Sequence, residues 1–258
     1  MVIEPRQAEP RAIWRWSRQA IQLVGRGFSF WLGLTALVCL WMFMGQRLPI
    51  LDAILALSTF FASILIAAQL DRQRFATLSD VLAMLRVNAR SILLFSTVIA
   101  IAGALIWILL LSRPEVPWWN AFYTERHQVV EFSPELYKAL RQIFVYAAYA
   151  LGLCYFGLNI PGLTSFFQFP CVTLLGLSFR QAYFVSADAQ VRNMPAILSI
   201  GLTFMLLPIV WVLLLPPLVP LLYAFFGALA YVSFREIFLG VGENQCLVPA
   251  AKPVMISP

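Results

Sequence analysis

The chain has 258 residues, of which 61% are apolar, 14% aromatic and only 12% charged. Soluble globular domains carry about twice that charged fraction, so the composition excludes an ordinary soluble enzyme. A mean hydropathy of +0.83 and long apolar runs indicate instead a polytopic membrane protein, for which lipid is the main solvent. The same composition excludes an intrinsically disordered chain and a small secreted domain held by disulfides.

The net charge of +6 would support nucleic-acid binding only if the positive side chains gathered on one folded surface. They follow the alternation of apolar segments and connections instead, and we therefore expect no nucleic-acid partner. The cysteines, at positions 39, 154, 171 and 246, lie in three apolar segments and near the C-terminus. Their spacing fits neither a disulfide framework nor a zinc site, so we expect no metal and no cofactor.

Residues 1–27 form a basic segment in which five arginines stand against two glutamates. The apolar run 28–44 that follows is too long for the core of a signal peptide, and no small-residue cleavage site comes after it. We therefore expect an uncleaved first span. Between Arg11 and Val24 the arginines alternate with aromatic and aliphatic residues, which predicts a helix at the level of the lipid headgroups. A disordered basic arm is the alternative.

Six apolar segments are each close to the ~20 residues that cross ~30 Å of hydrocarbon as a helix. Because an α-helix satisfies its own backbone hydrogen bonds in lipid, the sequence predicts an all-α fold, a polytopic transmembrane helix bundle of about six spans. The predicted spans are 28–44, 48–70, 91–111, 143–160, 195–215 and 218–234.

Residues 163–177 are also apolar, but this stretch has only 15 residues, contains Pro170 and follows a Pro161-Gly162 turn signal. The distribution of charge argues against a seventh span. With six spans and both termini in the cytoplasm, 13 of the 18 basic residues and 7 of the 12 acids lie inside, which is the asymmetry that membrane insertion favours. We interpret 163–177 as a broken or re-entrant continuation of the fourth span.

The spans divide the chain into a basic cytoplasmic or interfacial segment, an integral membrane domain and a cytoplasmic tail. The boundaries are 1–27, 28–240 and 241–258, with an external loop at 113–141 inside the membrane domain.

Two connections on the cytoplasmic side, 71–88 and 178–193, are amphipathic stretches that each precede a span. They predict two helices along the cytoplasmic surface. In the first, Thr77 and Asp80 have the spacing of a helix N-terminal cap. The likeness of the two stretches suits an internal duplication, although amphipathic connectors are common enough for coincidence.

The C-terminal third carries three short motifs, at 179–182 (FRQA), 191–195 (VRNMP) and 230–238 (AYVSFREIF). In these motifs the chain resembles an uncharacterised family of multi-pass inner-membrane proteins from proteobacteria. The resemblance implies a helical fold in a bacterial inner membrane. It implies no activity and no binding residues.

No set of residues converges on a catalytic site. His127 is the only histidine and lies in the predicted external loop among mixed charges, without a second metal ligand or a nucleophile motif. The close glycine pairs, Gly25 with Gly27 and Gly240 with Gly242, follow no strand and precede no phosphate-binding lysine. We therefore expect a protein that is not an enzyme.

Asp52 is the only Asp, Glu, Lys, Arg or His within a predicted span. An ionised side chain at the bilayer centre costs at least ~2.5 to 3.5 kcal/mol, and such residues often mark proton or ion paths. Asp52, however, lies only four residues into its span and five after Arg47, so we expect it to anchor the helix at the interface.

Uncharged polar residues and prolines around the broken segment form a second candidate site. Asn159, Pro161, Gln168 and Pro170 would either line a site for a small solute or satisfy the carbonyls that the break in the helix frees.

Small residues spaced four apart are typical of close helix packing in lipid. The sequence does not tell whether the neighbouring helix belongs to this chain or to another protein. The candidate packing residues are Ala104, Ala148, Gly152, Ala224 and Ala228.

The sequence favours a non-catalytic subunit or scaffold in the inner membrane, with both termini cytoplasmic. Its expected partners are membrane lipids and another membrane protein, and the oligomeric state stays open. The alternative is a transporter or channel for a small or lipophilic solute, which the broken segment and the possible repeat favour.

Overall fold

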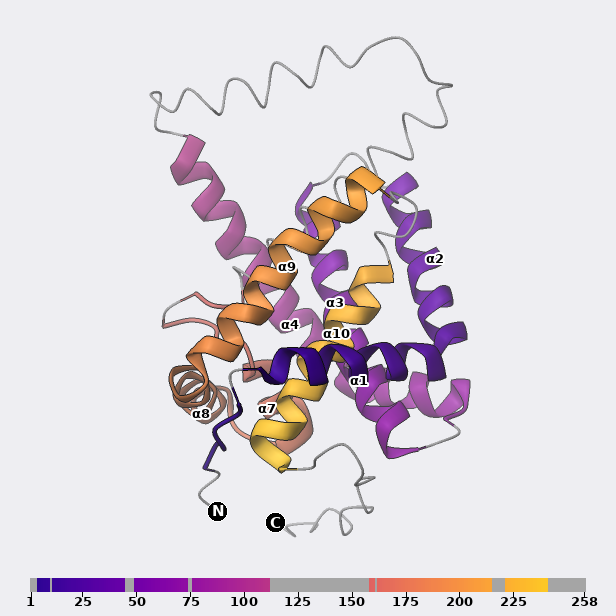
Figure 1. Ribbon diagram of the computed structural model, residues 1–258. Helices are drawn as coiled ribbons and strands as arrows, with labels where there is room; N and C mark the ends of the chain where they lie inside the picture. The colour runs from indigo at the N-terminus through magenta and orange to yellow at the C-terminus, as the bar shows by residue number, and fades with distance from the viewer. Residues whose placement is uncertain are drawn as a thin grey trace, which may run out of the picture.

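The computed structural model is helical throughout the part of the chain that it describes (Figure 1). Within that part there are eight α-helices, one π-helical turn and no strand. Three of the helices are long and apolar enough to cross a membrane, or four if the bent pair α8 and α9 counts as one span. The described residues are 4–9, 11–44, 49–73, 76–111, 158–160, 162–214 and 221–240.

The centre of the bundle is a pair of packed helices, α3 (Pro49–Arg72) and α10 (Leu221–Phe234). They approach most closely at Gly227, where a Cβ atom would overlap both the side chain and the backbone of Ser63. The Ser63 hydroxyl donates to the Thr59 carbonyl of its own helix at 2.8 Å and so needs no partner on α10. A missing side chain on one helix and a small one on the other therefore allow this contact.

Helix α4 (Leu78–Leu111) packs against α3, where Ser58 Oγ donates to Ser96 Oγ at 3.0 Å. The predicted cap is confirmed at its start. The Thr77 backbone N–H donates to Asp80 Oδ2 at 3.0 Å, and the Asp80 N–H donates back to Thr77 Oγ1 at 3.3 Å.

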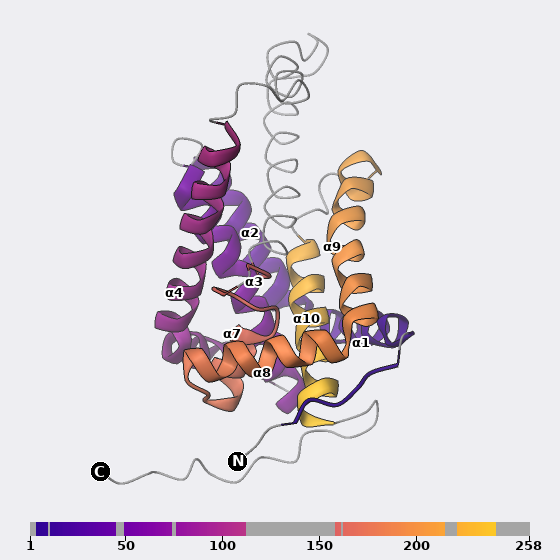
Figure 2. The ribbon, with the colours of Figure 1, turned by 90° about the vertical axis from the view of Figure 1, so that its left-hand side faces the viewer.

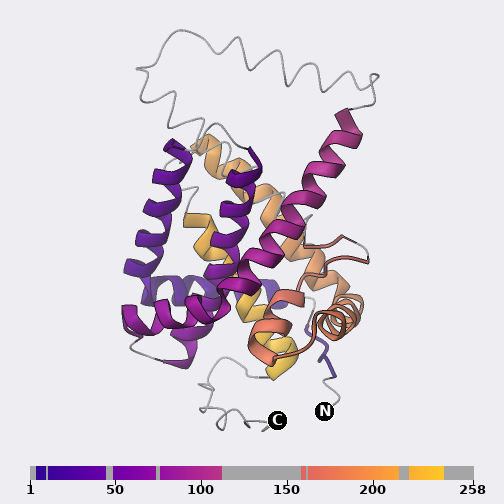
Figure 3. The same cartoon turned by 180° about the vertical axis from the view of Figure 1, so that it is seen from behind.

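The predicted surface helix at 71–88 and the predicted third span at 91–111 are joined in this single 34-residue helix. The expectation of two separate elements is corrected here. No proline or glycine occurs from residue 78 to residue 102, so nothing in the sequence interrupts the backbone hydrogen bonds. Figure 3 shows the first part of α4 lying across one end of the bundle before the helix turns upward. We call this end the base.

Helices α8 (Phe179–Arg192) and α9 (Met194–Leu214) meet at the base with a 97° bend, which Figure 2 shows from the side. Ser178 begins α8 with a reciprocal cap in which its side chain and that of Gln181 bond each other's backbone N–H groups. Pro195 fits the first turn of α9 but could not continue α8. The sequence therefore separates these two helices, unlike the stretch that forms α4.

Helix α7 (Gln168–Leu175) has eight residues and is preceded by turns. At about 1.5 Å per residue it is about 12 Å long, far short of the ~30 Å of a bilayer core. Residues 163–177 are thus interrupted, as the sequence predicted, and do not form a straight seventh span.

Helix α1 (Ala12–Arg26) lies across α10 at the base (Figure 1). It buries Trp16, Ala20 and Leu23, so a helix in this segment is confirmed and the disordered arm is wrong for these residues. Helix α2 (Phe28–Met44) follows directly.

Several predicted features fall outside the described residues. These are most of the fourth span, the external loop 113–141, residues 215–220 and the C-terminal tail 241–258.

Candidate functional site

Seven residues at the base join three helices through hydrogen bonds and ion pairs, and we call them the base network. They come from α1, from the end of α3, and from α10 with the π-helical turn η3 (Arg235–Leu239) that continues it. The members are Arg15, Trp16, Gln19, Asp71, Tyr231, Arg235 and Glu236.

The centre of the base network is a buried ion pair. Arg235 is only 6% exposed, and its Nη1 donates to Asp71 Oδ1 at 2.7 Å. The Tyr231 hydroxyl donates to the other carboxylate oxygen of Asp71 at 2.8 Å. Both oxygens of Asp71 therefore have a donor, which lowers the cost of burying the pair, while the buried Arg235 Nε has no partner among the described residues.

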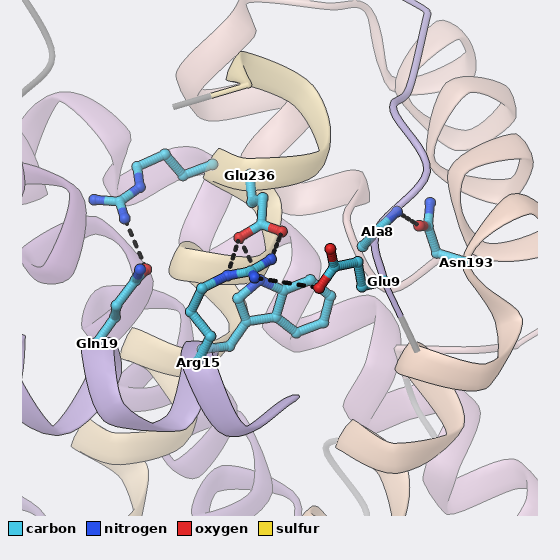
Figure 4. Close-up of polar contacts among 8 residues, drawn as sticks. Ala8, Glu9, Arg15, Gln19, Asn193 and Glu236 are labelled. Atoms are coloured by element: carbon cyan, nitrogen blue, oxygen red, sulfur yellow. Dashed lines mark hydrogen bonds and ion pairs between the residues drawn. The ribbon is translucent and has the colours of Figure 1, made fainter. Parts of the chain in front are cut away.

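Helix α1 joins the network through two consecutive residues of η3. Arg235 Nη2 donates to Gln19 Oε1 at 2.8 Å (Figure 4). Glu236 accepts from Arg15 Nη2 at 2.5 Å, from Arg15 Nε at 3.2 Å and from Trp16 Nε1 at 3.0 Å. The hydrogen bond to Glu236 raises the pKa of the Arg15 guanidinium above its ordinary value.

An extended segment at the N-terminal end, residues 4–9, is held against the base, and we call it the strap. The Arg6 N–H donates to the Ile237 carbonyl at 2.9 Å. Asn193, which is 1% exposed at the bend between α8 and α9, accepts from the Ala8 N–H at 2.6 Å and donates to the Arg6 carbonyl at 3.0 Å. One amide side chain thus binds both a donor and an acceptor of the strap backbone, and Figure 4 shows its bond with Ala8.

A second polar network holds the turns before α7 against α8. Ser165 Oγ donates to Gln190 Oε1 at 2.8 Å and lies 2.5 Å from Ser186 Oγ. Ser186 Oγ also accepts from the Phe167 N–H at 2.9 Å. Gln190 Nε2 in turn donates to the side-chain oxygen of Asn159. These contacts fix irregular backbone that no helix would otherwise satisfy.

Two of the four candidate residues around the broken segment contribute to this second network. Besides Asn159, the fully buried Gln168 accepts from the Ser165 N–H at 3.2 Å and donates to the Phe179 carbonyl at 3.1 Å. Pro170 is buried within α7. Pro161 lies outside the described residues.

The candidate packing residues of α10, Ala224 and Ala228, are buried within the chain at 2% and 0% exposure, so their neighbours are helices of the same molecule. Ala104 lies in α4, but its side chain is outside the described part. The same is true of Asp52 in α3, and Ala148 and Gly152 lie wholly outside it.

Sequence reasoning missed the base network and the strap. It counted Asp71 and Arg235 only as cytoplasmic charges, because 164 residues separate them. A local signal was present, since Tyr231 and Arg235 are four apart on one helix and place two donors on one face. Nothing in the sequence near Asn193 points to the strap, 185 residues away.

The described residues include no group of three metal-ligating side chains. The two networks link helices of the described part to one another through ion pairs and hydrogen bonds. Comparison of the chain with family models, with curated proteins and with solved structures finds no match.

Proposed function

We propose that the protein is a non-catalytic integral subunit or scaffold of a bacterial inner membrane that packs against other membrane proteins. One observation carries the proposal: the polar side chains of both networks point at one another, while α4 and α9 turn large aliphatic side chains outward. Among the described residues, the leucines, isoleucines and valines at about half exposure or more are Leu78, Leu82, Val87, Leu93, Leu94, Ile101 and Leu105 on α4 and Leu198, Leu202 and Leu206 on α9.

The proposed location rests on the sequence. The family resemblance of the C-terminal third supports a bacterial inner membrane, and the excess of basic residues in the predicted inside segments supports cytoplasmic termini. The partners that this placement implies are membrane lipids and at least one further membrane protein.

The second candidate function is a transporter or channel for a small or lipophilic solute. The interrupted segment before α7 and the 97° bend between α8 and α9 favour it, because discontinuous helices are frequent in transporters. Against it stands the use of Asn159, Ser165 and Gln168 to hold backbone and α8.

Site-specific photo-crosslinking tests the scaffold proposal. A photoreactive residue at Leu202 on α9 or at Leu94 on α4 should form an adduct with the same membrane protein in independent preparations. The matched control is Ala228, which is fully buried and should form none. Lipid adducts alone at both exposed positions would contradict the proposal.

A transport measurement separates the two candidate functions. The purified protein alone, in vesicles, should move no solute, and Asn159→Leu and Gln168→Leu should alter its stability rather than an uptake rate. Solute uptake by the purified protein that Asn159→Leu abolishes, with normal insertion, would establish the transporter instead.

Thiol labelling tests the orientation. In a variant that keeps Cys246 alone, a membrane-impermeant thiol reagent should label the protein only after the inner membrane is opened. A cysteine at Thr124 in a background without other cysteines should react in intact cells. Labelling of Cys246 from outside would place an odd number of spans in the chain.

A further inference from the structure

The described part of the chain has an excess of arginines that no acid neutralises. It contains eleven arginines, of which only Arg15, Arg192 and Arg235 form ion pairs there. Each of the six acids whose side chains are described is already engaged, five in these ion pairs and Asp80 in the cap of α4. The remaining arginines are all exposed: Arg6, Arg11, Arg18, Arg26, Arg72, Arg86, Arg90 and Arg180.

Three of these arginines sit beside a large exposed apolar residue four positions away. The pairs are Trp14 with Arg18 on α1, Leu82 with Arg86 on α4, and Phe184 with Arg180 on α8. The three apolar side chains are 79%, 55% and 58% exposed. Residues four apart lie on one face of a helix, so each helix presents a guanidinium and an apolar group together on its free surface.

The three helices lie at one level of the molecule. Figures 1, 2 and 3 show α1, the first part of α4 and α8 all running across the base, while α3, α9 and α10 run lengthwise. An apolar side chain beside a cation suits the boundary between acyl chains and headgroups. A guanidinium also matches a phosphate oxyanion in charge and in the geometry of its donors.

We propose that α1, the first part of α4 and α8 form a belt that selectively binds anionic phospholipids through headgroup phosphates and the adjoining apolar boundary. The occupant is a lipid rather than a soluble phosphate, because each guanidinium has an apolar companion that a free ion would leave in water. The inference rests on the proposed membrane location and not on the scaffold role.

Native mass spectrometry with defined lipids tests this belt. The purified full chain is mixed with phosphatidylglycerol and phosphatidylcholine of equal acyl length, and the bound lipids are counted. The protein should retain phosphatidylglycerol preferentially, and the preference should fall as salt is raised. Glycerol phosphate, which has the headgroup phosphate without acyl chains, should not displace the bound lipid.

A matched pair of triple variants locates the binding. Arg18→Gln, Arg86→Gln and Arg180→Gln together should lower the preference for phosphatidylglycerol by about tenfold or more, since each basic residue near an anionic surface contributes measurably. Arg113→Gln, Arg126→Gln and Arg141→Gln remove the same charge from the predicted external loop and should change it less than about twofold.

Four results would overturn the belt: no preference in the unaltered protein, equal losses in both triple variants, no loss in the first triple variant, or displacement by glycerol phosphate. A protein that inserts normally but shows no preference refutes the belt alone. A protein that does not insert into a bilayer refutes the proposed function. Thermal unfolding checks that the variants are folded, as expected for three exposed arginines that form no ion pair with a described acid.

Discussion

The segment Leu221–Leu239, which is α10 with η3, and the segment Leu78–Ala102 of α4 have nearly the same average hydropathy, but the fold uses them differently. In the apolar 18-residue stretch of each segment, 83% of the residues are buried in the first and only 28% in the second. The two helices differ in the size of their side chains and in their polar contacts. Helix α10 contacts α3 closely at Gly227 and continues into η3, where Arg235 forms the buried ion pair with Asp71. Helix α4 instead points leucine side chains outward.

This contrast teaches that hydropathy places a helix in the membrane but does not choose its neighbours. Lipid tails are as apolar as leucine, so no hydrophobic force draws two such helices together. Close approach at a glycine and hydrogen bonds at the helix ends supply the attraction instead. The central pair has both features, and each can be removed separately.

The largest expected effect comes from removing the charge partner of Arg235. Asp71→Leu should lower the free energy of unfolding in mild detergent by about 3 to 5 kcal/mol, because a buried guanidinium is left without its carboxylate. Asp188→Leu, at an exposed ion pair with Arg192, removes the same charge and should change little.

Adding Arg235→Met to Asp71→Leu removes both charges and should restore most of the lost stability. An Asp71→Leu variant as stable as the unaltered protein would show that the pair does not hold α10 in place.

Replacing one leucine by alanine in α10 and one in α9 compares a buried helix with a helix that has an exposed face. Leu229→Ala in α10 removes a fully buried side chain and should cost about 2 to 5 kcal/mol. Leu202→Ala in α9, where the side chain is 57% exposed, should cost about 0.5 kcal/mol or less. Both are measured by denaturant titration in one detergent. Equal costs would mean that the outward face of α9 is covered.

A matched pair of glycines isolates the close contact. Gly227→Leu should destabilise by about 3 kcal/mol, since its Cβ would overlap the backbone of Ser63. Gly33→Leu in α2 makes the same change where no atom lies within 4 Å and should be neutral or slightly stabilising. Thermal unfolding of the two variants gives the difference, and equal melting temperatures would rule out the contact.

The smallest expected effect is at the strap. Asn193→Ala should destabilise by about 1 to 2 kcal/mol, because the Ala8 N–H and the Arg6 carbonyl lose a partner. Limited trypsin digestion should then cut after Arg6 about tenfold faster. Asn88→Ala is the control, since the Asn88 amide donates to the Met84 carbonyl of its own helix. Unchanged cleavage would show that the strap does not depend on Asn193.

The sequence predicted well those features that depend on residues close together along the chain. Apolar length and turn signals place α9 at Met194–Leu214 against a predicted 195–215, and the Thr77–Asp80 spacing locates the start of α4. Residues close along the chain set these features. The unbroken path of α4 was also readable from the lack of proline and glycine over residues 78–102, but the change from amphipathic to apolar sequence suggested a boundary.

What the sequence did not predict depends on pairs of distant residues. Asn159 and Gln168 stand out as polar groups in an apolar region, but their partners Gln190 and Phe179 belong to α8. Hydrogen bonds of this kind have no periodic pattern. They follow from a packing arrangement that hydropathy and spacing leave undetermined.

The base network and the strap join parts of the chain that leave the ribosome at very different times. Arg15 is made 221 residues before Glu236, and Ala8 is made 185 residues before Asn193. During translation α1 is therefore made long before Glu236, the residue that accepts from Trp16. Closing the base is one late step between distant segments, the kind of contact that forms slowly. The order of synthesis thus makes α10, with η3, the segment that completes the base network.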